Sequence, residues 1–236
     1  MQIVLSFLDS IFIEVLRYIF TNQEAFLLAK SFFETLYMVF FSCILSVIFG
    51  LPLGVFLCIS KKGGLKPMLS LNKTIGSVVN VVRSFPFIIL VILLIPLSRL
   101  VIGTSIGSTA AIISLFISAT PFIARLFESA LDEVDKGLVE ASKSLGASKF
   151  TIIKMMIAES MPALINAVVV TVINLVGYSA MAGALGAGGL GDLAMREGYY
   201  KYNTEMLLYS VVLIIILVQL IQSIGDFIVK RLRKNR

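Results

Sequence analysis

The chain has 236 residues, of which 58% are hydrophobic and only 14% are charged. A water-soluble domain of this length needs far more polar surface, so the composition excludes a soluble globular protein and indicates one polytopic membrane domain. The formal net charge of +6 would suit a nucleic-acid-binding protein. Its cations, however, are grouped between apolar runs, and we therefore expect no nucleic-acid partner.

Residues that carry enzyme chemistry are scarce. The sequence contains no histidine, and its two cysteines, Cys43 and Cys58, fall in one apolar run. It has no spacing typical of a metal site or a disulfide framework. It also lacks a Walker A pattern, an HExxH motif and a Ser-His or Cys-His pair. We therefore expect no catalytic residues, no metal and no cofactor, which makes a membrane-embedded enzyme the weaker interpretation.

Residues 1–30 form a separate N-terminal segment. The run is apolar overall, but Asp9, Glu14 and Arg17 interrupt it. Each of these charges would be costly at the centre of a bilayer. The pattern predicts an amphipathic helix at the membrane interface, with a transmembrane span as the alternative. The charged start and cleavage site of a signal peptide are missing.

The first predicted span covers residues 35–60, which carry no charge over 26 residues. About 20 residues suffice to cross a bilayer. Pro52 should kink this helix, and Gly50 and Gly54 should let a neighbouring helix approach closely. A short basic loop follows, with Gly63-Gly64 as its turn.

The second predicted span, residues 75–98, contains an arginine and a proline. Arg83 must face protein or water if it lies inside the span, which makes it a candidate functional residue. In the alternative, the span begins later and Arg83 extends back to the basic loop. Pro86 predicts an irregular helix, which is tolerated only where it faces protein or a cavity. Arg83, Ser84 and Pro86 are therefore candidates for a polar path through the membrane.

Residues 100–124 form the third predicted span, and a charged segment, residues 125–159, follows it. The span is rich in Gly, Ser and Ala, which suits close helix packing. In the charged segment, Glu140-Ala141-Ser142 favours a helix, Gly146 interrupts it, and helix-forming residues resume at 149–157. Two short helices joined at a glycine can present a protruding corner to a partner in the aqueous phase.

The fourth predicted span, residues 160–183, has one polar face. On a 3.6-residue period Asn166, Asn174, Tyr178 and Met181 fall within an arc of about 120°. Such a face should point toward protein, where it contacts a solute or bonds a neighbouring helix. We favour the helix bond for Asn166. Asn174, Tyr178, Ser179 and Met181 are candidates for the path.

Five glycines between 183 and 191 predict a tight re-entrant turn or a close backbone crossing. No strand precedes them and no Gly-Lys-Ser/Thr follows, which argues against a phosphate-binding loop. An exposed loop with three tyrosines is expected next. The fifth predicted span covers residues 206–228, and residues 230–236 form a basic tail.

The distribution of Lys and Arg predicts the orientation. With five alternating spans, the basic loop, the charged segment and the tail share one side and carry 14 of the 20 cations, whereas five lie on the other side. Cytoplasmic loops carry the excess of Lys and Arg. We therefore expect these three segments in the cytoplasm and the N-terminus outside.

Several motifs resemble one transporter family. Glu140-Ala141-Ser142 followed by Gly146 and Ala147 is similar to the EAA loop of bacterial ATP-binding-cassette (ABC) import permeases, although Ser142 replaces the second alanine. The family's closing Ile-x-Leu-Pro is also altered, since its proline comes three residues later, at Pro162. Five further stretches, within residues 31–226, resemble methionine-import permeases: Arg83–Leu90 (RSFPFIIL), Gly103–Gly107 (GTSIG), Pro121–Arg125 (PFIAR), Leu175–Met181 (LVGYSAM) and Gly188–Asp192 (GGLGD).

The resemblance implies an all-α type I ABC importer permease fold and a multi-pass subunit of a bacterial inner membrane. It implies that residues 125–159 are a coupling loop, in which Glu140, Ala141, Ser142, Gly146 and Ala147 contact a cytoplasmic ATPase present in two copies. A second copy of the permease, an extracytoplasmic substrate-binding protein or lipoprotein, and membrane lipid would be the other partners. Methionine is the expected solute. Another amino acid such as cystine, and an ATP-independent secondary transporter or channel, are the alternatives.

Overall fold

Residues 23–234 are described by the structure, a computed structural model, and every regular element among them is helical. The predicted all-α polytopic fold is thereby confirmed. The predicted interfacial helix over residues 1–30 lies largely outside the described residues. The elements are α2 (Gln23–Ser60), α3 (Leu69–Ser84), α4 (Phe87–Ile102), α5 (Ser108–Asp132), α6 (Lys136–Ser144), α7 (Lys149–Glu159), α8 (Met161–Ala182), η1 (Gly183–Ala187), α9 (Gly189–Leu193), η2 (Ala194–Tyr199) and α10 (Thr204–Lys234).

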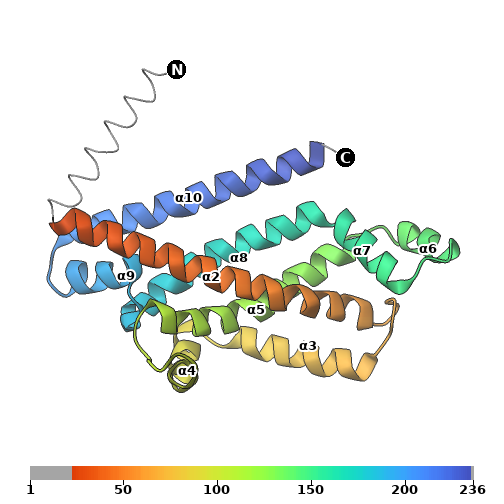
Figure 1. Ribbon diagram of the computed structural model, residues 1–236, viewed down its shortest axis with the longest axis horizontal. Helices are drawn as coiled ribbons and strands as arrows, with labels where there is room; N and C mark the ends of the chain where they lie inside the picture. Colours follow the sequence, from red (N-terminus) through yellow and green to blue (C-terminus); the bar gives the residue numbers. More distant parts are fainter. Residues whose placement is uncertain (1–22, 235–236) are drawn as a thin grey trace.

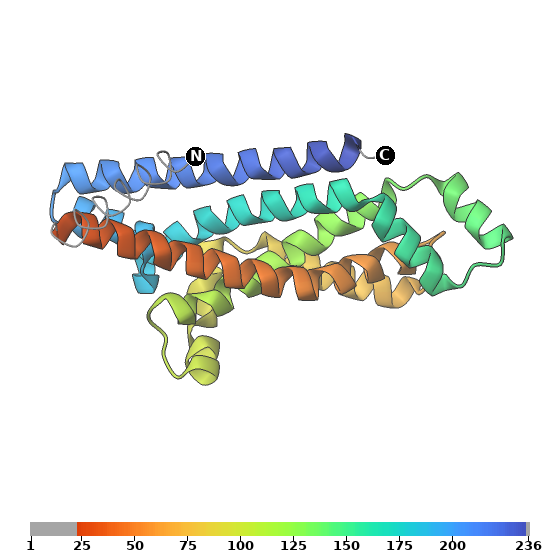
Figure 2. The same ribbon diagram turned by 45° about the horizontal axis from the view of Figure 1, so that its top comes forward.

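Four of these helices are long and apolar enough to cross a membrane: α2, α5, α8 with its continuation to Ala187, and α10. Helices α3 and α4 pass the same test only as a bent pair, so the count is four, or five with this pair, in agreement with the prediction of about five. The long helices run side by side, and α4 is seen end-on (Figure 1). The loop after α2, the coupling-loop helices α6 and α7, and the C-terminal end of α10 lie toward one end of the bundle (Figures 1 and 2).

The irregular helix predicted at Pro86 in the second span is confirmed as a sharp bend, because α3 and α4 meet at an angle of 107°. Pro86 lacks the N–H that a continuous helix needs, and the residue before a proline favours extended backbone. The third span starts at Ser108 and not near residue 100, since Gly103 and Gly107 adopt left-handed φ values of 84° and 99°. Residues 230–234 of the predicted tail continue α10 as helix.

Helices α2 and α5 pack along a seam that contains the glycines expected to allow close approach. A Cβ atom added at Gly54 would lie 2.7 Å from the carbonyl oxygen of Ala124 and 2.8 Å from Cβ of Phe127. One at Gly50 would collide with Ile123. The close approach predicted for these two glycines is therefore confirmed, and α2 runs through Pro52 to Ser60 without interruption.

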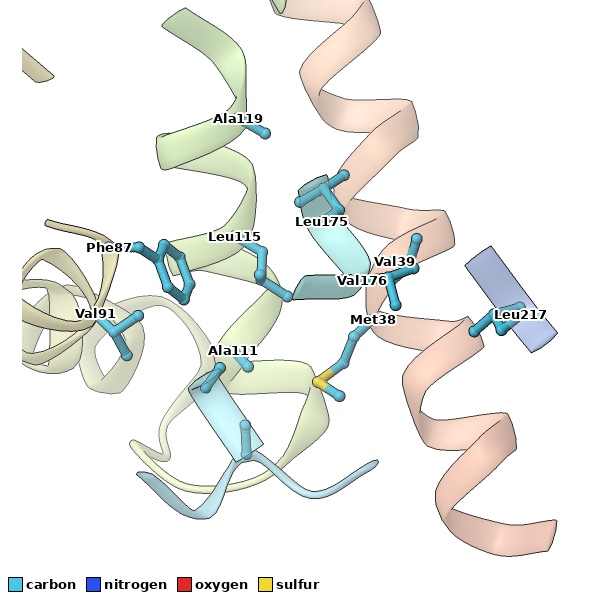
Figure 3. Close-up of a cluster of buried hydrophobic side chains, with 12 residues drawn as sticks. Met38, Val39, Phe87, Val91, Ala111, Leu115, Ala119, Leu175, Val176 and Leu217 are labelled. Carbon is cyan, nitrogen blue, oxygen red and sulfur yellow. The ribbon is translucent and has the colours of Figure 1, made fainter. Parts of the chain in front are cut away.

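The central core joins all the long helices. Met38 and Val39 of α2 lie beside Leu115 of α5, with residues of α4, α8 and α10 around them (Figure 3). The glycine-rich turn after α8 folds back against this core. A Cβ atom at Gly183 would lie 2.5 Å from the amide nitrogen of Asp192, which confirms the close backbone crossing.

Candidate coupling surface and solute cavity

The coupling loop is built from two capped helices and a glycine. Asp135 accepts a hydrogen bond from the N–H of Gly137 (2.8 Å) at the start of α6, and Ser148 accepts one from the N–H of Thr151 (3.2 Å) at the start of α7. Such caps satisfy backbone donors that a helix leaves unpaired. Gly146 between them has φ +75°. A residue with a side chain rarely adopts this conformation, so glycine fixes the angle between the helices.

The two helices differ in how they attach to the bundle. Helix α7 is anchored, because Ile152 and Met156 are buried against Cys58, Leu131 and Val134. Helix α6 has no buried residue. Leu145, at the tip of the loop, is 87% exposed, and Leu138 of α6 and Phe150 of α7 are also exposed. Large apolar side chains held in water on a protruding corner are typical of a docking surface.

The five residues predicted to couple to an ATPase lie on or next to α6. Glu140, Ala141 and Gly146 are exposed, whereas Ser142 and Ala147 are half-buried. Ser142 donates its hydroxyl hydrogen to the carbonyl oxygen of Leu138 (2.9 Å). The hydroxyl is therefore satisfied within α6.

A bend at Phe85-Pro86 brings Arg83 into a cavity. Arg83 lies 14 residues after Leu69, which at 1.5 Å per residue is about 21 Å along α3 from the basic loop. The alternative in which the span begins later and Arg83 lies outside it stays an untested prediction, since the apolar helix α4 begins only at Phe87. The guanidinium carbon lies 5.8 Å from the centre of the Phe122 ring of α5.

The cavity has a volume of about 380 Å³ and is formed by four helices. Arg83 and Ser84 come from α3, and Tyr178 comes from α8. The Tyr178 ring stacks on Phe87 of α4, with the ring centres 4.3 Å apart and the planes 6° from parallel. Pro86 lines a neighbouring open cavity together with Asn80 and Ser84. Arg83, Ser84 and Tyr178 thus line one cavity, and Pro86 lines its neighbour.

The other candidates on α8 lie elsewhere. Asn174 donates its amide hydrogen to the carbonyl oxygen of Val170 in its own helix (3.2 Å). Ser179 is buried and donates to Val176 (2.7 Å), whereas Met181 is exposed. None of the three lines the cavity that contains Arg83. Asn166 is exposed in the single chain, so the interhelical bond favoured for it is not formed within residues 23–234.

Two further contacts were not anticipated from the sequence. Arg125 of α5 donates to Glu128 (2.6 Å) and reaches α3, where it donates to the carbonyl oxygen of Gly76 (3.0 Å) and to Oδ1 of Asn80 (3.1 Å). At the far end of the bundle, Glu34 accepts a hydrogen bond from the N–H of Gly189 (2.8 Å). The sequence signals for Arg125 were its place at the end of an apolar run and in the stretch Pro121–Arg125, and neither signal identifies its partners.

The fold defines a multi-pass helical membrane protein with a bent helix pair beside a cavity and a protruding, glycine-broken loop at one end. Residues 50–235 match the family described as binding-protein-dependent transport system inner membrane component. The chain belongs to this family, as the EAA-like loop predicted.

Curated relatives and solved structures agree. The chain is 50% identical over 206 residues to the probable D-methionine transport system permease protein MetI of Vibrio cholerae, covering 87% of this chain and 92% of the relative. It is 46% identical to the methionine import system permease protein MetP of Bacillus subtilis, covering 92% and 98%. A chain of the MetNI methionine ABC transporter in an inward-facing conformation superposes with a TM-score of 0.86 at 45% identity, covering 88% and 96%.

Proposed function

We propose that this chain is the permease subunit of an ATP-driven importer for methionine. The observation that carries the proposal is the identity of 40–50% to methionine permeases over most of their length, together with the superposition on a chain of the MetNI transporter. Methionine is the solute named for these relatives. ATP hydrolysis resides on a partner ATPase that docks on the coupling loop.

The proposed assembly contains two permease chains and two ATPase subunits. Five spans enclose too little space for a gated path, so the path lies at the two-fold axis between two copies. ATP binding draws the two ATPase subunits together and moves both coupling loops. Because α7 is packed against Leu131 of α5, this movement is transmitted to the transmembrane helices as rigid bodies. An extracytoplasmic binding protein delivers the solute.

The proposed orientation places the coupling loop, the basic loop after α2 and the C-terminus in the cytoplasm. Their position toward one end of the bundle supports this orientation, as does the bias of Lys and Arg. The solute path includes Arg83, Ser84, Pro86 and Tyr178 at the cavity. Asn174, Ser179 and Met181 extend it along α8.

The decisive experiment is uptake of labelled methionine into proteoliposomes that contain the permease, its ATPase and the binding protein. We expect uptake that requires internal ATP and that excess unlabelled methionine abolishes. Competition by cystine but not by methionine would show that the transported solute is a different amino acid. Uptake by the permease without ATPase would instead favour the secondary transporter.

The role of the coupling loop is tested at Gly146. Gly146→Val cannot easily adopt φ +75°, whereas Gly146→Asn adopts left-handed backbone with little strain. We expect the valine variant to insert normally, to lose co-purification with the ATPase, and to fall about tenfold or more in uptake, since a docking loss of 1.4 kcal/mol is a factor of 10. The asparagine variant should transport at close to the unmodified rate. Normal uptake by the valine variant would contradict the role of the loop.

A further inference from the structure

The charge of Arg83 is not balanced within the described chain. None of the ion pairs formed among residues 23–234 includes Arg83. Its one recorded side-chain contact is the face of the Phe122 ring, which offers a weak attraction and no acceptor oxygen. Arg83 is exposed in the single chain and lines the cavity, so its guanidinium is open to an anionic partner from outside residues 23–234.

The polar wall next to Arg83 presents hydrogen-bond donors. Asn80 lines the same cavity, and its Oδ1 already accepts a hydrogen bond from Arg125 (3.1 Å). This hydrogen bond orients the amide, and its NH₂ group remains as a donor. Ser118 lines the α5 side, but its hydroxyl hydrogen is already donated to the carbonyl oxygen of Leu115 (2.9 Å). A guanidinium beside an amide donor matches a carboxylate, which accepts hydrogen bonds and donates none.

The remaining walls are apolar and aromatic. The stacked rings of Phe87 and Tyr178 form one side, with Leu90 beside them and the Phe122 ring on α5. Phe87 belongs to the central core (Figure 3), so this side of the cavity is fixed by packing. Aromatic faces and edges bind aliphatic chains and thioether sulfur well. The volume of about 380 Å³ lies within the range of small-molecule sites.

We infer that this cavity binds the transported amino acid during its passage, with the solute carboxylate held by Arg83 and its apolar side chain against Phe87, Tyr178 and Phe122. The inference rests on the proposed function and deepens it, because it places a recognition site inside the membrane in addition to the external binding protein. In this site the permease itself recognises the α-carboxylate of the solute through Arg83.

The test measures binding of ³⁵S-methionine to the purified permease–ATPase complex in non-ionic detergent, without the binding protein. The competitors are unlabelled methionine, 4-(methylthio)butanoate, which lacks only the amino group and keeps the carboxylate, and methioninol, in which an alcohol replaces the carboxylate. We expect methioninol to compete about tenfold or more less well than methionine, because it leaves the guanidinium unpaired. The butanoate should retain most of the competition.

Variants separate recognition from structure. Arg83→Gln should weaken methionine binding about tenfold or more and reduce the preference for methionine over methioninol to about twofold or less. Arg83→Lys should keep part of the affinity and part of the preference. Arg99→Gln removes an exposed arginine of α4 outside the cavity and should change neither. Co-purification with the ATPase checks that each variant is folded and assembled.

Three results would overturn the site. The first is equal competition by methionine and methioninol in the unmodified complex, and the second is undiminished binding by an assembled Arg83→Gln complex. The third is loss of methionine binding on addition of phosphatidylglycerol, which would assign Arg83 to a lipid phosphate. ATP-dependent methionine uptake that persists in Arg83→Gln would leave the proposed function standing. Absence of uptake by the unmodified system would instead refute the function itself.

Discussion

Helix α5 packs against α2 and against α3 in different ways. Toward α2 the glycines of the seam bring the backbones together, so that Gly54 has no room for even a methyl group. Toward α3 the packing is sparse, since α3 buries only Gly76 and Val79. Two hydrogen bonds from Arg125 hold α3 to α5 there. A close-packed seam resists sliding, whereas polar contacts can exchange at little cost, so we expect movement to be concentrated at α3, next to the cavity.

The largest expected effect is at the seam. Gly54→Val forces two branched methyl groups into the backbone of α5 and should destabilise the protein by about 3 kcal/mol or more. The unfolding temperature and yield of the protein in detergent measure this. Gly177→Val is the matched control, because a Cβ at Gly177 of α8 meets nothing within 4 Å. Equal losses at both positions would show that the seam is not specially tight.

A smaller effect is expected where α3 is held. Arg125→Gln removes the charged donor that joins α5 to Gly76 and Asn80 of α3. Charged hydrogen bonds contribute about 1.5–3 kcal/mol, so we expect uptake per ATP hydrolysed to fall about tenfold while the folded protein persists. Lys73→Gln, an exposed substitution on α3 itself, is the control. An unchanged ratio of transport to hydrolysis in the Arg125 variant would show that α3 is not held by these bonds.

The smallest effect is expected near the N-terminal end of α2, at Glu34. Glu34→Ala removes the oxygen that accepts the N–H of Gly189 and should cost about 1–2 kcal/mol. For a chain of this size the unfolding temperature should drop by about 2–8 °C. Glu34→Gln keeps a carbonyl oxygen and should recover most of the loss. If the alanine and glutamine variants unfold at the same temperature, the hydrogen bond to α9 contributes nothing measurable.

The amino-acid sequence alone predicted the apolar runs, their number and the glycine-broken coupling loop. These features depend on local composition: an uncharged run of 26 residues must leave water wherever the chain folds. Gly146 likewise acts through its own backbone angle. The resemblance of short motifs added the family, because their residues and spacing are legible without any structure.

Tertiary structure alone decided which polar groups meet. Asn174, Tyr178 and Met181 share a helical face in the sequence, yet only Tyr178 lines the cavity with Arg83, because the bend at Pro86 turns α4 toward that turn of α8. Glu34 and Gly189 are 155 positions apart, and no local pattern pairs them. Hydrophobic periodicity determines which segments enter the membrane, whereas the packing of one helix against another determines which side chains touch.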